Sequence, residues 1–419
     1  MSLTLDIHNH IAVKTYLFER NITTEITDGI FPDQRSVNVF QSQTTLPLMA
    51  SGSVQGVIAS HYVPERGLLD STVPWVKPVE EAILRPILND KIEEDNWGNK
   101  TFTKTLESIH LFEAKVLEAQ SNGFPNVMLA TNKEKLHEAI ANNKTFFLQS
   151  VEGAHHLGRG TVLEHQIANL HQLFSEGICY LTLGHFFPND FIRPVQGLPP
   201  DVVANFMNDE YRAIDFTAEN QAGLTDKGKL LVQEMFEIGI VVDLTHSNEE
   251  ARRQVFAMNR DRVTQGKKNR PVIMSHVGVQ GLFKDPDPKN AHNIFLGASD
   301  TDIAGIKECN GVIGIIFFNY WLTGIGDVTD GSSKNFGLKN IAKAVNYIAA
   351  QCGGSFDHIA IGSDFDGMTD PPDNLDNISK LPFLRHYLLD NINSTDREAD
   401  VNKIFGQNML RVLNEGWDA

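Results

Sequence analysis

The chain has 419 residues and a net charge of −17, from 36 basic and 53 acidic side chains. This acidic balance, with no basic block to offset it, argues against nucleic acid or an anionic membrane as a partner. No run approaches the roughly 20 apolar residues of a membrane span, and we recognise no secretory leader, so we expect a cytoplasmic protein. The three cysteines show no paired spacing and predict packed thiols rather than a disulfide framework.

Eight short apolar runs organise the chain, and each ends in a polar residue that is able to do chemistry. Apolar runs of this length, rich in Val and Ile and separated by helical stretches, are typical of a parallel sheet buried on both faces. Eight such units in series predict an α/β fold, a closed (β/α)8 TIM barrel, with functional residues at the carboxyl ends of its strands. No compositional break interrupts them, so we expect a single domain that comprises residues 1–419. In chain order the runs end at His8 with His10, His61, Glu152, His185, His246, His276, Asn319 and Asp364.

The segments between these runs have the features of crossover helices. Residues 104–120 space their apolar side chains at three and four, which predicts an amphipathic helix. A second helix is expected over 225–239, between a capping Thr225 and Gly239, and a third over 340–354, which ends on paired glycines. The last segment, 398–417, predicts closing helices that pack on the outside of the barrel.

Three connections are longer than the loop between a strand and a helix requires. Each follows a predicted strand, so all three rise from the face of the barrel that carries the histidines. Long loops on this face are expected to form lids and substrate walls. They cover residues 62–103, 186–222 and 277–303.

Four histidines and one glutamate at strand ends predict a metal site. His8 and His10 are two apart on one strand, so both side chains point to the same side. Glu152 ends another strand, where a buried carboxylate is costly unless something positive meets it, and its two oxygens can serve two cations. We therefore expect a binuclear site, with a mononuclear site as the alternative. One metal would lie on His8, His10 and Glu152, and the other on Glu152, His246 and His276.

The donor set also indicates the metal and the remaining catalytic groups. Imidazoles with one carboxylate favour Zn2+, two per chain, with Mn, Fe or Co as alternatives. Asp364 is expected to take a proton from the bridging water and pass it to the leaving group. His185, which is not needed as a ligand, is expected to hydrogen-bond the substrate carbonyl and stabilise the oxyanion.

Other polar residues near these strand ends are candidates for supporting roles. Asp366 is expected to hydrogen-bond nearby backbone or ligands. His61 is equally well explained as a structural histidine or as a substrate contact. One of His155 and His156 is a candidate to orient a metal ligand. Arg193, in the second long loop, is a candidate to bind substrate.

Six motifs in this order resemble the renal (membrane) dipeptidase family of the amidohydrolase superfamily. The resemblance runs from the first strand to the last helix and implies a (β/α)8 barrel with two zinc ions bridged by Glu152. It also implies a substrate-contacting histidine at His185, a proton-shuttling aspartate at Asp364, and dipeptide hydrolysis. The motifs are His8-Asn9-His10, Glu152-Gly153-Ala154-His155, Thr182-Leu183-Gly184-His185, Asp243-Leu244-Thr245-His246, Pro271-Val272-Ile273-Met274-Ser275-His276 and Asp364-Phe365-Asp366-Gly367.

The chain departs from this family at two points. His10 stands where the family usually has an aspartate, which removes one negative charge from the site. The family also places an arginine soon after the strand-six histidine to hold the substrate carboxylate, whereas here no arginine follows His276 before Arg385. Lys284 and Lys289 are candidates for this role, although a lysine cannot form the same bidentate fork.

These observations together predict a binuclear metal-dependent dipeptidase, in which a metal-bridging hydroxide attacks the amide carbonyl. The alternatives are an amidohydrolase that acts on another small amide, lactone or ester, and an inactive barrel that binds a ligand. The expected partner is a small-molecule substrate, and a homodimer is a reasonable expectation for a barrel of this kind.

Overall fold

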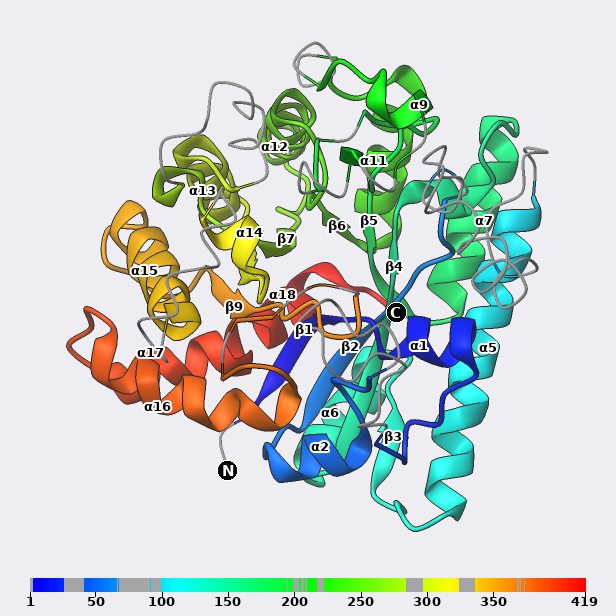
Figure 1. Ribbon diagram of the computed structural model, residues 1–419. Coiled ribbons are helices and arrows are strands. Elements are labelled where there is room, and N and C mark those ends of the chain that lie inside the picture. The colour runs from blue at the N-terminus through cyan, green and yellow to red at the C-terminus, as the bar shows by residue number, and fades with distance from the viewer. Residues whose placement is uncertain are drawn as a thin grey trace.

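A computed structural model of the chain describes residues 3–25, 41–65, 99–193, 222–283, 297–323, 336–367 and 374–419, with isolated positions and short stretches between these ranges. Nine parallel strands form one sheet (Figure 1). The strands are β1 (Leu5–Asn9), β2 (Gly56–His61), β3 (Val127–Leu129), β4 (Thr145–Glu152), β5 (Ile178–Thr182), β6 (Val241–Asp243), β7 (Val272–Val277), β8 (Val312–Ile315) and β9 (Ile359–Ile361).

Eight of these strands close into a barrel, which confirms the predicted TIM barrel. The order is β2-β1-β9-β8-β7-β6-β5-β4-β3, and an additional pairing between β2 and β4 closes the ring. The remaining strand, β3, pairs with residues 145–147 at the start of β4 and lies at the end of the strand order, outside the ring. This short strand is not among the eight predicted runs.

Helices surround the barrel between successive strands (Figure 1). The predicted helix over 225–239 is confirmed, because the Thr225 side chain accepts a hydrogen bond from Gly228 and Gly239 has φ 79° at the other end. None of the helices in the described ranges is both long and apolar enough to cross a membrane. The helices are α1 (Ile11–Phe18), α2 (Leu46–Ser51), α5 (Lys100–Ser121), α6 (Lys133–Ala141), α7 (Leu163–Ser175), α9 (Asp209–Arg212), α11 (Asp226–Ile238), α12 (Glu249–Thr264), α13 (Asp300–Glu308), α14 (Asn319–Thr323), α15 (Phe336–Gln351), α16 (Leu381–Asn391), α17 (Arg397–Asn402) and α18 (Asn408–Gly416).

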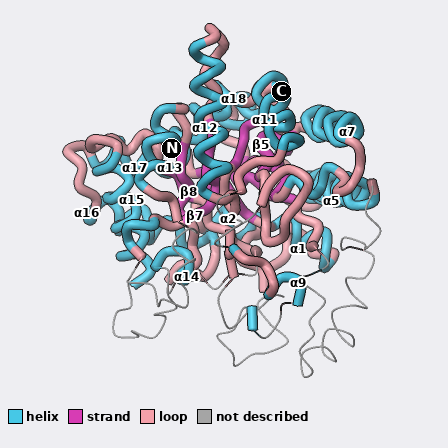
Figure 2. Tube along the Cα trace, turned by 90° about the horizontal axis from the view of Figure 1, so that it is seen from above, coloured by secondary structure: helices cyan, strands magenta, loops and turns pink. Residues whose placement is uncertain are grey.

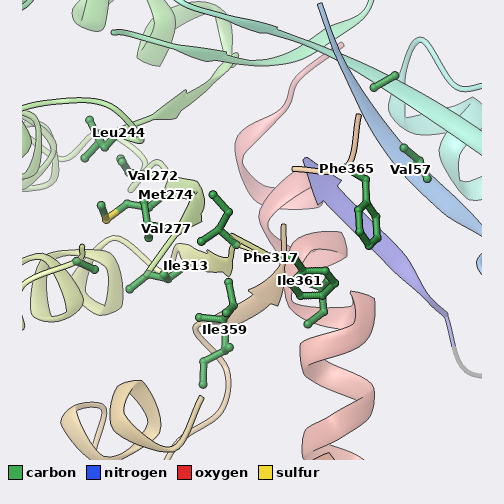
Figure 3. Close-up of a cluster of buried hydrophobic side chains, with 14 of the residues drawn as sticks. Val57, Leu244, Val272, Met274, Val277, Ile313, Phe317, Ile359, Ile361 and Phe365 are labelled. Carbon is green, nitrogen blue, oxygen red and sulfur yellow. The ribbon is translucent and has the colours of Figure 1, made fainter. Parts of the chain in front are cut away.

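Alternation along the strands separates two hydrophobic layers. Strand residues such as Met274, Ile313 and Ile361 face the surrounding helices in the larger cluster, part of which Figure 3 shows. Phe146 and Leu148 of β4 belong to a second cluster that fills the barrel. Because side chains alternate along a strand, Glu152 lies on the same face of β4 as these two residues and so points into the barrel.

The C-terminal helix α18, which the sequence predicts to pack on the outside of the barrel, closes the amino end of the barrel. Leu413 and Trp417 are fully buried and pack in the cluster that fills the barrel. A Cβ atom on Gly416 would approach Val241 and Pro271, where β6 and β7 begin. Figure 2 shows α18 at one end of the molecule and α14 at the other. The long apolar face of α18 is buried because the open floor of the barrel offers it an apolar surface.

Candidate metal centre

The carboxyl ends of five strands bring six side chains to one buried site. The sequence predicts all six, as five metal ligands and one proton carrier, and each is at most 6% exposed. Three groups of described residues have ligand atoms close enough to hold a metal ion: His8, His10 and Asp364; His8, Glu152 and His276; and Glu152, His185 and His246. They share residues with the two predicted ligand sets but match neither set fully, and His185 belongs to one of them. The six are His8, His10, Glu152, His246, His276 and Asp364.

Glu152 lies between two pairs of histidines. Its Oε1 atom is 3.2 Å from His246 Nε2 and 3.3 Å from His276 Nε2. Its Oε2 atom is 3.2 Å from His10 Nε2, and His8 Nε2 lies 3.6 Å from Oε1. Oε1 thus faces His8 and both histidines of the second pair, while Oε2 faces His10. Both pairs approach this one carboxylate, which suits a residue shared by two cations.

Asp364 lies on the side of the site that carries His8 and His10. Its Oδ1 atom is 3.2 Å from His10 Nε2 and 3.9 Å from His8 Nε2. Asp364 and His246 both have positive φ, 61° and 62°, a conformation that non-glycine residues rarely adopt. Such strain is concentrated at functional sites, and here it occurs three residues after the ends of β6 and β9.

Hydrogen bonds at Nδ1 fix the tautomers of two of the histidines. The Tyr180 hydroxyl donates to the Ile7 carbonyl at 3.0 Å, so at 2.8 Å it accepts from Nδ1–H of His8. Ser275 likewise donates to Asp243 at 2.6 Å and accepts from Nδ1–H of His276 at 2.9 Å. Both imidazoles therefore turn the Nε2 lone pair toward the site, as metal-binding histidines require.

The site has the donor chemistry of a cation site. Burial, the largest influence, lowers the pKa of His8 and of His276 well below its usual value, so both rings are neutral. Within the described part of the chain, Glu152 Oε1 is buried and receives no hydrogen bond. Converging lone pairs beside a carboxylate oxygen without a donor fit a bound cation, and neutral imidazoles with a carboxylate fit zinc.

His10 behaves differently from the other histidines. Burial lowers its pKa, but the charge of Glu152 and a hydrogen bond to Asp364 outweigh burial and raise it to about 10. In the metal-free protein His10 is therefore an imidazolium between two carboxylates. A metal ion that binds here must displace this proton.

His185 is held by a residue that the sequence analysis missed. Its Nδ1 atom lies 2.8 Å from Oε2 of Glu65, a buried carboxylate just beyond β2. Its Nε2 atom lies 3.8 Å from Oε2 of Glu152, so the ring bridges Glu65 and the metal site. Glu65 is a single carboxylate in a long loop, and no sequence spacing links it to His185.

His61 and Asp366, two further polar residues near the strand ends, have structural roles. His61 is structural, because its ring lies between Ser108 and Gln149 at 2.8 and 2.9 Å. Asp366 accepts hydrogen bonds from the backbone nitrogens of Gln43 and Thr44, as expected.

His155 and His156 do not contact a metal ligand through their ring nitrogens in the hydrogen bonds that the structure defines. Instead, both bond the backbone of Val63, at 3.1 and 2.8 Å.

The predicted substrate-binding role of Lys284, Lys289 and Arg193 stays a prediction. Lys284 and Lys289 lie outside the described residues. Arg193 is partly buried, and its carbonyl accepts a hydrogen bond from Asn248 at 2.8 Å. Trp321, which the sequence analysis did not predict, lies beside His246 and His276. Its ring centroid is 5.1 Å from that of His246 and 5.9 Å from that of His276.

A parallel barrel that gathers four histidines and two carboxylates at the carboxyl ends of its strands belongs to the class of metal-dependent hydrolases. The model of the membrane dipeptidase family (peptidase family M19) matches residues 3–416. The chain therefore belongs to this family, as the resemblance of its motifs implies.

Curated relatives have names that agree with this family. Dipeptidase tcpJ of Claviceps purpurea is 27% identical over 311 residues, which cover 74% of this chain and 59% of the relative. Dipeptidase verJ of Clonostachys rogersoniana is 25% identical over 394 residues, which cover 92% of this chain and 80% of the relative. The match thus spans less than two thirds of the Claviceps protein.

Solved structures have the same fold. A metallopeptidase from Rhodobacter sphaeroides, bound to a phosphinate mimic of the dipeptide L-Ala-D-Ala, has a TM-score of 0.69 at 19% identity, with all of both chains covered. The metallopeptidase named dipeptidase AC has a TM-score of 0.67 at 19% identity and covers 100% of this chain and 99% of its own. At this identity the likeness establishes the (β/α)8 fold.

Proposed function

We propose that this protein is a binuclear metal-dependent dipeptidase. The observation that carries the proposal is the position of Glu152, whose Oε2 faces His10 while its Oε1 faces His246 and His276. Family membership and the dipeptidase names of the curated relatives support the peptide substrate. His8, His10 and Glu152 would hold one cation, and Glu152, His246 and His276 the other, with zinc as the metal that suits these donors.

The residues around this metal centre can transfer protons and stabilise the developing negative charge. When bound, the two cations would polarise the amide carbonyl. They would also lower the pKa of a water molecule, so that hydroxide is available as the nucleophile at neutral pH. Asp364 lies against the first histidine pair, where it can accept a proton and return it to the departing amine. Burial lowers the pKa of His185, but the charges of Glu65 and Glu152 outweigh burial and raise it, so the ring can carry a proton on Nε2 as well as on Nδ1. His185 then presents Nε2–H toward Glu152 and can donate a hydrogen bond to the carbonyl oxygen as negative charge develops there.

Metal content and dipeptide turnover, measured on the same preparation, test this proposal. The purified chain is stripped, reloaded with Zn2+ or Mn2+, analysed by plasma mass spectrometry, and assayed on a panel of L-L and L-D dipeptides. We expect two metals per chain and metal-dependent release of free amino acids. Two metals without turnover of any dipeptide would contradict the substrate and direct the search to other small amides, lactones or esters. Failure to retain metal after reloading would contradict the mechanism itself.

A further inference from the structure

Glu65 is a buried carboxylate that the proposed chemistry leaves without a role. It is 2% exposed, and three groups donate hydrogen bonds to it. Tyr62 Oη and His185 Nδ1 lie 2.5 and 2.8 Å from Oε2, and the backbone nitrogen of Phe187 lies 3.3 Å from Oε1. The three donors come from two loops, one after β2 and one after β5, so Glu65 joins these loops at the edge of the site.

The loop that carries Glu65 is itself anchored to β4. His155 Nε2 donates to the Val63 carbonyl at 3.1 Å, and His156 Nε2 accepts from the Val63 nitrogen at 2.8 Å. Both histidines follow Glu152 in the η3 turn (Ala154–Leu157). The turn that follows the shared carboxylate thus fixes the loop that presents Glu65.

The hydrogen-bond chemistry of the pair sets the direction of the His185 ring. A carboxylate only accepts hydrogen bonds, so the proton between Glu65 and His185 must be on Nδ1. With Nδ1 held in this way, Nε2 is the only ring nitrogen that faces the metal site. The ring of Tyr62 packs on the His185 ring, with centroids 4.3 Å apart, and limits its rotation about the bond to Glu65.

The charge state of Glu65 suits this role. Burial alone would raise the pKa of Glu65, but the charge of His185, that of His155 and the hydrogen bonds from His185 and Tyr62 together hold it well below the usual range. Glu65 is therefore ionised across the pH range in which an enzyme works. An ionised acceptor forms stronger hydrogen bonds than a neutral one, so it holds the imidazole more firmly.

We infer that Glu65 is a positioning residue, which fixes the His185 ring through Nδ1 and aims Nε2 at the carbonyl oxygen of the substrate. This inference rests on the proposed function, in which His185 stabilises the oxyanion. Glu65 does not touch the substrate, and it acts through His185 alone. Its contribution should therefore appear in the transition state and vanish when His185 is removed.

A double-mutant cycle with Glu65→Gln and His185→Ala tests this dependence. Glu65→Gln keeps the size of the side chain and should lower kcat by about 10- to 100-fold, the range typical of groups that orient catalytic residues, with KM changed less than threefold. In the His185→Ala background the same substitution should change kcat less than twofold. Losses that multiply in the double mutant would overturn the inference, because they would show a structural role independent of His185.

Two further measurements separate positioning from folding and from the proposed function. Metal content must remain equal in the wild type and in Glu65→Gln, and Asp418→Asn, which removes a carboxylate at the far end of the barrel, should leave kcat unchanged. In protein with 15N-labelled histidine, a slowly exchanging Nδ1 proton of His185 should be present in the wild type and lost in Glu65→Leu, which removes both acceptor oxygens. If no dipeptide is cleaved but this proton behaves as expected, the proposed function fails and Glu65 still fixes the ring. If the proton is absent from the wild type, the inference fails whatever the activity.

Discussion

The Nε2 atom of His10 lies 3.2 Å from Oδ1 of Asp364, so the expected proton carrier directly contacts an expected metal ligand. Asp364 is also close enough to His8 and His10 to complete a metal-binding group with them. The structure therefore allows two roles for this carboxylate, and these roles differ in what its removal does to metal content.

Asp364→Asn distinguishes the two roles. If Asp364 is the proton carrier, Asp364→Asn should lower kcat by about 10²- to 10⁴-fold. The amide retains the size of the side chain, so two metals should stay bound. Turnover and metal content are measured on the same reloaded sample. Asp366→Asn is the matched control, because that carboxylate bonds the backbone of residues 43 and 44 and should affect stability more than kcat. A variant that loses one metal would show that Asp364 is a ligand, and near-normal turnover would exclude it as the proton carrier.

Metal uptake should release a proton from His10. The pKa of His10 in the metal-free protein is raised to about 10, so at pH 7 the ring carries a proton that metal binding must remove. Apparent metal affinity should therefore rise with pH, by up to tenfold per unit, until about pH 10. Calorimetry in buffers of different ionisation enthalpy counts the released protons. Affinity that does not change between pH 6 and 9 would contradict a protonated His10.

The same shift predicts how the metal-free protein responds to alkali. Because the folded pKa of His10 lies above the ordinary value of 6.5, its contribution to stability is complete below pH 6.5 and is lost as pH rises through about 10. The melting temperature of the stripped protein should consequently fall between pH 7 and 10, and it should fall less in His10→Gln. Equal decreases in the two proteins would assign the effect to other groups.

The hydrogen bonds at Nδ1 of His8 and of His276 should each affect the affinity of one of the two metal sites. Ser275→Ala removes the acceptor of Nδ1–H of His276, and Tyr180→Phe removes that of His8. Each loss should weaken metal binding by about 10- to 100-fold, since orienting groups contribute at this level. Competition with a chelator, followed by metal analysis, should show one weakened metal per chain in each variant. Full affinity in both variants would contradict the orienting role.

Much of this site could be predicted because barrel topology collects the ends of strands. His8, Glu152 and His276 are far apart in the chain, yet each directly ends an apolar run, and parallel strands bring these ends to one rim. Glu65 could not be found in this way, because it lies in a loop whose path the strand pattern does not determine. Its contacts with His185 and Phe187 depend on how the loops after β2 and β5 fold over the site.

The location of α18 shows a similar limit. The spacing of its apolar residues predicts a helix with one buried face, and the structure confirms the helix over Asn408–Gly416. Periodicity does not say which apolar surface covers that face, so the side of the barrel and its amino end are equally consistent with the sequence. The choice is settled by tertiary packing, in which Trp417 joins the interior cluster.

Leu413→Ala tests the energetic importance of this closing helix. Leu413 is fully buried at the amino end of the barrel, and loss of a buried leucine side chain typically costs about 2–5 kcal/mol, partly through the cavity it leaves. The matched control is Leu117→Ala on α5, because Leu117 is 62% exposed and its truncation should cost less than about 0.5 kcal/mol. Denaturant unfolding measures both variants. Equal stabilities would contradict a structural role for α18 as the floor of the barrel. Because the metal centre lies at the opposite end, folded Leu413→Ala should retain its metal content.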